Sequence, residues 1–110
     1  MKLSAYIIAY NEAQKIADTI NSVLWADEII VADSNSTDET AQIARDLGAR
    51  IVQIPFRGFG HLRNQAIQSC THEWIFSLDT DEQCTPEVRD EILMILSGTP
   101  VHDAYLVPRR

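Results

Sequence analysis

A chain of 110 residues has the length of one compact domain, and a composition of 45% hydrophobic and 23% charged residues is typical of globular proteins and excludes intrinsic disorder. The formal net charge of −7 gives a surface potential that repels nucleic-acid backbones, so we expect no nucleic-acid partner. The two cysteines form no CxxC pair and no apolar run reaches the roughly 20 residues of a membrane span, so we expect residues 1–110 to form a single cytoplasmic domain.

Short apolar runs alternate along the chain with segments of helical period, which is the pattern of βαβ units. The predicted strands, in chain order, cover residues 3–9, 28–32, 50–54, 74–78 and 104–107. Asn11 and Ser36 each precede a Gln or Glu by three residues, the spacing of a capping box, and are predicted to open the first two helices. Gly48 is predicted to end the second helix, and Thr85 to cap the fourth. We therefore expect an α/β fold with a mostly parallel sheet of four to five strands and helices on both faces.

Acidic side chains follow three of the predicted strands, at the point where each strand ends. These residues are Glu12 after the first strand, Asp33 after the second, and Asp79 and Asp81 after the fourth. Because ligands of an open parallel sheet bind at the carboxyl ends of its strands, the clusters are candidates for one ligand site. Alternate residues of an extended segment project to one side, so Asp79 and Asp81 can present both carboxylates to one cation, and oxygen ligands select Mg²⁺ or Mn²⁺. Such a cation would let a protein of net charge −7 hold phosphate groups.

Each of these residues also has a purely structural explanation. Asp79 and Asp81 could close a turn and cap the following helix, because a DxD pair alone fits either reading. Asp33 could accept an N–H from a nucleobase or could cap a turn. Glu12 could be a partner of a helix dipole, and Tyr10 a lid over the core.

Arg63 differs in charge from the acidic clusters and lies in the third predicted helix. Its guanidinium could pair with a carboxylate that holds the site, or it could contact a diphosphate directly. A solvated surface arginine is the alternative.

Four ordered motifs resemble those of family 2 glycosyltransferases, the inverting enzymes of the GT-A fold. The motifs are AYNE at residues 9–12, VADSNSTD at 31–38, RNQAI at 63–67 and LDTDE at 78–82. Their order and spacing are more specific than any one motif, and the likeness runs from about residue 3 to the C-terminus. The resemblance implies the Rossmann-like nucleotide-binding half of a GT-A fold. Many relatives have glycine where this chain has Asn35 and Glu39, so the loop after the second strand could differ in shape.

The resemblance also implies roles for individual residues at the nucleoside. It implies that Ala9, Tyr10 and Glu12 line the nucleoside pocket. Asp33 would contact the base.

At the sugar diphosphate, the resemblance implies that Asp79 faces the ribose and the metal, and that Asp81 ligates the metal. Arg63 would support the diphosphate region. The implied cofactor is a divalent metal, Mg²⁺ or Mn²⁺.

The implied donor is a nucleotide sugar, most often a UDP-sugar in this family. The stretches 79–86 and 105–110 look most like the subgroup that adds a hexose to the lipopolysaccharide inner core, so the expected acceptor is a glycan or a lipid-linked sugar. Peripheral contact with the inner membrane face follows from such an acceptor. In this family the acceptor-binding half and the general base lie well after the DxD, and this chain stops soon after Asp81. We therefore expect donor binding with little or no transfer, no catalytic base in this chain, and an open apolar face that would favour a homodimer.

Two other functions remain open on the sequence. One is a non-catalytic module that holds a nucleotide sugar without turnover. The other is a phosphotransferase of the haloacid dehalogenase type, since an apolar strand precedes Asp-x-Asp. That motif follows the fourth strand rather than opening the domain, and no later Lys or acidic pair completes the set, which disfavours the phosphotransferase.

Overall fold

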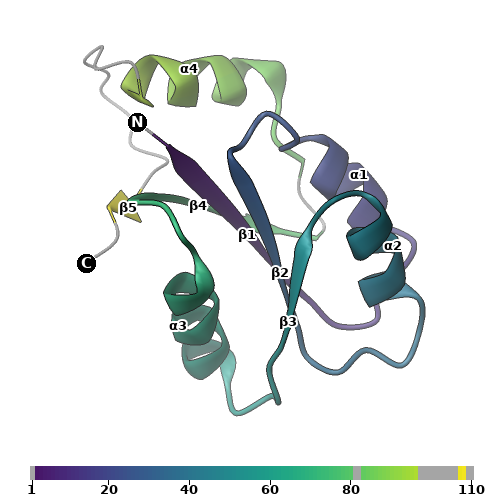
Figure 1. The fold of residues 1–110 in the computed structure, drawn as a ribbon. Coiled ribbons are helices and arrows are strands. Elements are labelled where there is room, and N and C mark those ends of the chain that lie inside the picture. The colour runs from purple at the N-terminus through teal and green to yellow at the C-terminus, as the bar shows by residue number, and fades with distance from the viewer. Residues whose placement is uncertain (1, 81–82, 97–106, 109–110) are drawn as a thin grey trace.

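The computed structural model describes residues 2–80, 83–96 and 107–108, and in it the predicted apolar runs form one sheet (Figure 1). The strands are β1 (Leu3–Ala9), β2 (Glu28–Asp33), β3 (Arg50–Gln53), β4 (Trp74–Asp79) and β5 (Val107–Pro108). The helices are α1 (Ile16–Asn21), α2 (Thr40–Asp46), α3 (Phe59–Ser69) and α4 (Pro86–Leu96). None of the described helices has the length and apolar character that a membrane crossing needs.

The sheet has the strand order β3-β2-β1-β4-β5. The first four strands pair in parallel, and β5 pairs with β4 in the antiparallel direction. This confirms the predicted α/β class and mostly parallel sheet, and the first four predicted strands lie within one residue of the observed bounds. Of the predicted fifth strand, residue 107 begins β5, whereas 104–106 lie outside the described residues.

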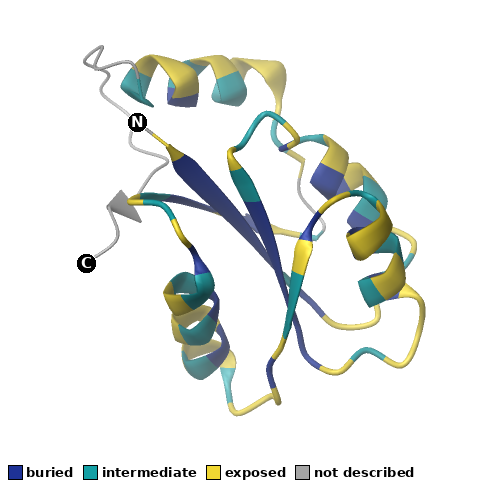
Figure 2. Cartoon of the chain, viewed as in Figure 1, coloured by how far each residue is buried: buried dark blue, intermediate teal, exposed yellow. Residues whose placement is uncertain are grey.

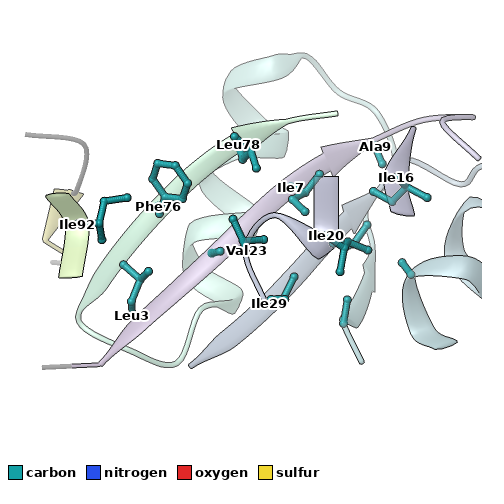
Figure 3. Packing of buried hydrophobic residues seen from close by; sticks show 14 residues of the cluster. Leu3, Ile7, Ala9, Ile16, Ile20, Val23, Ile29, Phe76, Leu78 and Ile92 are labelled. Atoms are coloured by element: carbon teal, nitrogen blue, oxygen red, sulfur yellow. The ribbon is translucent and has the colours of Figure 1, made fainter. Parts of the chain in front are cut away.

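The central strand β1 is buried on both sides because its residues are almost all apolar. Leu3, Ala5 and Ile7 face a cluster that contains residues of α1, α2 and α4 (Figure 3). Tyr6 faces the other side, where a second cluster contains Leu62 and Ala66 of α3.

The helices therefore cover both faces of the sheet, as predicted, with α3 opposite the other three (Figure 1). Figure 2 shows that the buried residues gather on the strands and on the helix sides that face them.

Two of the predicted helix starts are wrong. The first helix begins at Ile16 without a side-chain cap, because Asn11 adopts a left-handed backbone (φ 50°) and its side-chain oxygen accepts a hydrogen bond from the backbone N–H of Thr37 at 2.8 Å. The second helix begins at Thr40, and the Ser36 hydroxyl donates to the Asp33 carboxylate instead of capping it. In both cases the polar side chain forms a hydrogen bond with a neighbouring loop or strand end. The spacing of a capping box does not reveal such a contact.

The other predicted helix signals are confirmed. Gly48 has φ +96°, the left-handed conformation that ends a helix and favours glycine. The Thr85 hydroxyl oxygen accepts a hydrogen bond from the backbone N–H of Val88 at 3.2 Å, as a helix cap does. Asn35 has φ 55°, so this asparagine adopts the backbone conformation that glycine favours, and asparagine is among the residues that tolerate it.

A partly buried carboxylate joins the amino ends of the strands. The Glu28 carboxylate accepts hydrogen bonds from the Thr71 backbone N–H at 2.8 Å, the Thr71 hydroxyl at 2.7 Å and the Ser4 hydroxyl at 2.7 Å, and it forms an ion pair with Arg50 at 3.4 Å. Burial by itself would raise the pKa of Glu28, but the bonds from Thr71 and Ser4 and the charge of Arg50 lower it to about 2.

We expect Glu28→Gln to lower the free energy of unfolding by about 1–2 kcal/mol near neutral pH, because the amide presents a donor to groups that need an acceptor. The folded pKa of Glu28, about 2, lies below its ordinary value of 4.5, so the carboxylate stabilises the fold above about pH 4.5 and loses this effect as the pH falls through about 2. Urea unfolding of both proteins at about pH 7 and about pH 2.5 measures the difference. The exposed Glu39→Gln serves as the control, and a Glu28 difference that stays constant with pH would contradict this assignment.

Candidate functional site

An open pocket of about 800 Å³ lies at the carboxyl ends of β1, β2 and β4, beside the first turns of α3. This volume is within the range of small-molecule sites in proteins. Its lining residues are Ile8, Ala9, Tyr10, Glu12, Lys15, Ser34, Phe56, Phe59, Leu62, Arg63, Asp79 and Thr80. The pocket therefore forms where the parallel-sheet rule places ligands.

The strand register brings the two sides of the pocket floor together. Ile8 pairs with Asp79 of β4 and with Ala32 of β2, and residues paired in this way project from the same face of a sheet. That face is the one on which α3 packs, since Ala32 and Leu62 belong to the same buried cluster. Asp79 thus lies at the end of β4 on the α3 side, where α3 also supplies Leu62 and Arg63 to the pocket.

Five of the residues predicted for a site line this pocket, and they come from three separate parts of the chain. They are Ala9, Tyr10, Glu12, Arg63 and Asp79. Ala9 is buried at the end of β1, whereas the Tyr10 side chain stands 57% exposed at the pocket wall. The fold therefore brings together the motifs that the sequence separates by up to about 70 positions.

One predicted residue, Asp33, is placed differently. Asp33 is fully buried at the end of β2 and is not part of the pocket lining, whereas its neighbour Ser34 is. The Asp33 carboxylate accepts hydrogen bonds from the Ser36 hydroxyl and, at 2.9 Å, from the Ser36 backbone N–H. Its contact with a base stays a prediction. Asp81 lies outside the described residues.

Among the described residues, the charged side chains that line the pocket are two cations, Lys15 and Arg63, and two carboxylates, Glu12 and Asp79. Within the described part of the chain Arg63 forms no ion pair with a carboxylate. Both functional readings of Arg63 therefore stay predictions. Such a cation is notable in a protein of net charge −7, because the surrounding potential would otherwise oppose a phosphate ligand.

For a metal, the described residues supply Asp79 as a pocket carboxylate. No group of three His, Cys, Asp or Glu side chains gathers among residues 2–80, 83–96 and 107–108. A site with one or two carboxylates is nevertheless the arrangement that Mg²⁺ adopts when substrate phosphates complete its ligands. Oxygen donors of this kind fit Mg²⁺ or Mn²⁺ rather than a thiol-seeking metal.

The sequence analysis missed an aromatic pair at the pocket. Phe56 and Phe59 stack edge to face, with ring centroids 5.2 Å apart and an interplanar angle of 74°. Both line the pocket and both are exposed, Phe59 by 70%. The available signal was two Phe residues around Arg57 and Gly58, the second of which begins α3. Exposed aromatic rings next to a cavity can pack on a planar ring or on the apolar face of a sugar.

Comparison with known proteins connects this pocket to a family. The model of glycosyl transferase family 2 matches residues 4–108. An uncharacterized glycosyltransferase of Rickettsia felis is 44% identical over 106 residues, which cover 96% of this chain and 37% of the relative. The lipopolysaccharide core biosynthesis glycosyltransferase LpsC of Rhizobium meliloti is 31% identical over 115 residues, which cover 100% of this chain and 43% of LpsC.

Solved structures agree with the family match. The glucosyl-3-phosphoglycerate synthase of Mycobacterium tuberculosis, in complex with Mn²⁺, uridine diphosphate and glucosyl-3-phosphoglycerate, is similar with a TM-score of 0.64 and 30% identity over 72% of this chain and 33% of that one. TarS of S. aureus (residues 1–349) is similar with a TM-score of 0.71 and 28% identity over 88% of this chain and 33% of that one. The chain spans less than half of the length of each of these relatives.

The fold and the pocket define an α/β protein with a candidate ligand site at the carboxyl edge of a mostly parallel sheet. The chain belongs to glycosyl transferase family 2. The predicted family and the predicted Rossmann-like GT-A fold are thereby confirmed. Membership of this family leaves the phosphotransferase reading without support.

Proposed function

We propose that this chain binds a nucleoside-diphosphate sugar, a UDP-hexose, together with Mg²⁺ or Mn²⁺, and so forms the donor site of a glycosyltransferase. The observation that carries the proposal is the convergence of Tyr10, Glu12, Arg63 and Asp79 on one pocket at the carboxyl edge of the sheet. The similar synthase of Mycobacterium tuberculosis, crystallised with Mn²⁺ and uridine diphosphate, supports the choice of ligand.

The nucleoside would occupy the part of the pocket next to the end of β1. There Ala9 contributes a small buried wall and Tyr10 an exposed aromatic ring that can stack on a base. Glu12 carries its carboxylate on the same loop, where it can accept hydrogen bonds from ribose hydroxyls. An aromatic surface for the base and an acceptor for the ribose are thus supplied by two residues of one loop.

The diphosphate would lie between α3 and the end of β4. Arg63 can donate two hydrogen bonds to phosphate oxygens in the fork geometry of a guanidinium. Asp79 and Asp81 would hold the divalent metal, which neutralises charge on the diphosphate when it is bound. The role of these residues is to orient the donor so that the bond between the anomeric carbon and the diphosphate can break.

Transfer in this proposal is a direct displacement at the anomeric carbon, in which a base removes the proton of the acceptor hydroxyl. No described residue is assigned as that base, because a carboxylate that ligates the metal has its basicity suppressed. We propose a lipopolysaccharide-core or other glycan acceptor, because the similar LpsC is a lipopolysaccharide core glycosyltransferase. An acceptor anchored in lipid would place the protein in peripheral contact with the cytoplasmic face of the inner membrane.

Calorimetric titration of UDP into the chain, with and without Mn²⁺, tests the proposal. The expected result is saturable binding that requires the metal. UMP provides the comparison, since it lacks the second phosphate and is expected to bind at least about 10-fold more weakly. Absence of UDP binding at millimolar protein and ligand concentrations would overturn the proposed function.

Arg63→Ala is expected to weaken UDP binding by about 10- to 100-fold, because it removes the charge-assisted hydrogen bonds to phosphate. Arg63→Lys is expected to restore only part of the affinity, since a point charge cannot reproduce the fork. Titration of UDP in the presence of Mn²⁺ measures the affinity of both variants. Arg45→Ala, which removes an exposed arginine of α2, is the matched control. Unchanged binding by Arg63→Ala would mean that this residue is only a solvated surface charge.

A further inference from the structure

The loop between β1 and α1, which carries Tyr10 and Glu12 into the pocket, is held by the loop between β2 and α2. The backbone N–H of Asn11 donates to the Ser36 hydroxyl oxygen at 2.8 Å. The backbone N–H of Glu12 donates to the Thr40 hydroxyl oxygen at 2.8 Å. Two successive amides of the pocket loop are therefore bound by side chains from another segment.

Each of these hydroxyls donates its hydrogen to a carboxylate. The Ser36 hydroxyl donates to Asp33, and the Thr40 hydroxyl donates to Asp38. A hydroxyl has a single hydrogen. Once that hydrogen is donated to a carboxylate, the hydroxyl oxygen can only accept a hydrogen bond from the amide N–H. The carboxylate therefore fixes the direction of both bonds in this relay of carboxylate, hydroxyl and amide. Hydrogen bonds in such a chain polarise and strengthen one another.

The position of Asp33 suits this role better than direct contact with a ligand. The residue has no exposed surface, and its two carboxylate oxygens accept from the Ser36 hydroxyl and the Ser36 backbone N–H. The amide that Ser36 receives belongs to Asn11, whose left-handed backbone (φ 50°) is uncommon outside glycine and needs support from its surroundings. A second bond, from the Thr37 N–H to the Asn11 side chain at 2.8 Å, ties the same two loops together.

We propose that Asp33 is a positioning residue that acts through Ser36 on the Asn11 amide and thereby sets Tyr10 and Glu12 at the nucleotide pocket. The proposal rests on the proposed function of that pocket. It differs from a role for Asp33 at the base, because here the carboxylate touches Ser36 and not the ligand.

The opposite end of the sheet contains a natural control. The Ser4 hydroxyl donates to the Glu28 carboxylate at 2.7 Å and accepts the His72 backbone N–H at 3.1 Å. The carboxylate, hydroxyl and amide are hydrogen-bonded here in the same order as at Asp33, Ser36 and Asn11. Ser4 is fully buried. Because Ser4 lies near the amino end of β1, away from the pocket, its loss should change stability without changing the pocket loop.

The test is a double-mutant cycle of Ser36→Ala and Asp33→Asn, with UDP affinity measured in the presence of Mn²⁺. Each single variant is expected to weaken binding by about 10-fold, and the double variant by no more than either single one, because both remove the same relay. Ser36→Thr keeps the hydroxyl and is expected to retain most of the affinity. Ser4→Ala is expected to lower the free energy of unfolding while leaving the UDP affinity unchanged.

Several outcomes would overturn the relay. Additive losses in the double variant would place Asp33 on the ligand itself, and unchanged affinity in Ser36→Ala would show that the relay does not set the pocket.

A ligand-free measurement separates this proposal from the proposed function. The amide resonances of Tyr10 and Glu12 are expected to shift in Ser36→Ala and not in Ser4→Ala, and the reverse pattern would refute the relay whether or not UDP binds.

Discussion

Replacing Asp79 by asparagine is expected to weaken Mn²⁺-dependent UDP binding by about 100-fold, which corresponds to about 2.7 kcal/mol. Asp79 lines the pocket at the end of β4 and is the carboxylate there that the register sets beside Ile8 of β1. Asparagine keeps the size and one acceptor oxygen but removes the negative charge that a divalent metal requires. Without metal, neither protein is expected to show saturable UDP binding, since the binding that Asp79→Asn weakens is metal-dependent.

The matched control for Asp79→Asn is Asp90→Asn on α4, which makes the same charge change at an exposed side chain outside the pocket lining. We expect this control to bind UDP as the unaltered chain does. Metal-dependent binding that survives Asp79→Asn at full strength would remove Asp79 from the metal site and leave the donor site without a described metal ligand.

Ile7→Ala is expected to lower the free energy of unfolding by about 3–4 kcal/mol, a large share of the roughly 5–15 kcal/mol that stabilises a domain of this size. Ile7 is fully buried in the central strand and packs in the cluster that joins β1 to α1, α2 and α4 (Figure 3). Deletion of its side chain removes apolar contacts and leaves a cavity between the sheet and the helices that pack on it. Urea unfolding at neutral pH measures the change.

Two variants calibrate that measurement. Ile7→Val removes one methyl group and is expected to cost about 1 kcal/mol. Leu24→Ala removes a side chain that is 54% exposed and should change stability by about 0.5 kcal/mol or less. A loss at Ile7 as small as that at Leu24 would contradict the assignment of β1 to the centre of the sheet.

The strands could be predicted from the sequence because each is a short apolar run, and burial on both faces of a parallel sheet requires such a run. The position of the pocket followed from the same pattern, since the carboxyl ends of parallel strands meet at one edge. Tyr10, Glu12 and Asp79 could therefore be grouped in advance although they lie far apart in the sequence.

The partners of the loop residues could not be predicted in this way. Asn11 and Ser36 have the spacing of helix caps, but a neighbouring loop or strand end offers each of them a partner that a local pattern does not contain. The same limit applies to Asp33 and Ser34, which are adjacent in sequence. Asp33 pairs with Ala9, which lines the pocket, so the strand pattern does not predict that the Asp33 carboxylate accepts the Ser36 hydroxyl while Ser34 borders the pocket.

The aromatic pair was missed for a different reason. Phe56 precedes α3, and Phe59 begins it three positions before Leu62 and seven before Ala66, so the helical period groups Phe59 with the buried face. Both rings are nevertheless exposed at the pocket, and hydrophobic periodicity predicts burial rather than exposure.

The central claim, that the pocket at the carboxyl edge of the sheet holds a nucleoside diphosphate, is tested most directly by amide chemical-shift mapping with UDP and Mg²⁺. The account predicts shifts concentrated at Tyr10, Glu12, Ser34 and Arg63, with the amides of Ser4 and Thr71 at the other end of the sheet unchanged. Shifts centred on Ser4 and Thr71, or the absence of any shift at saturating UDP and Mg²⁺, would contradict it.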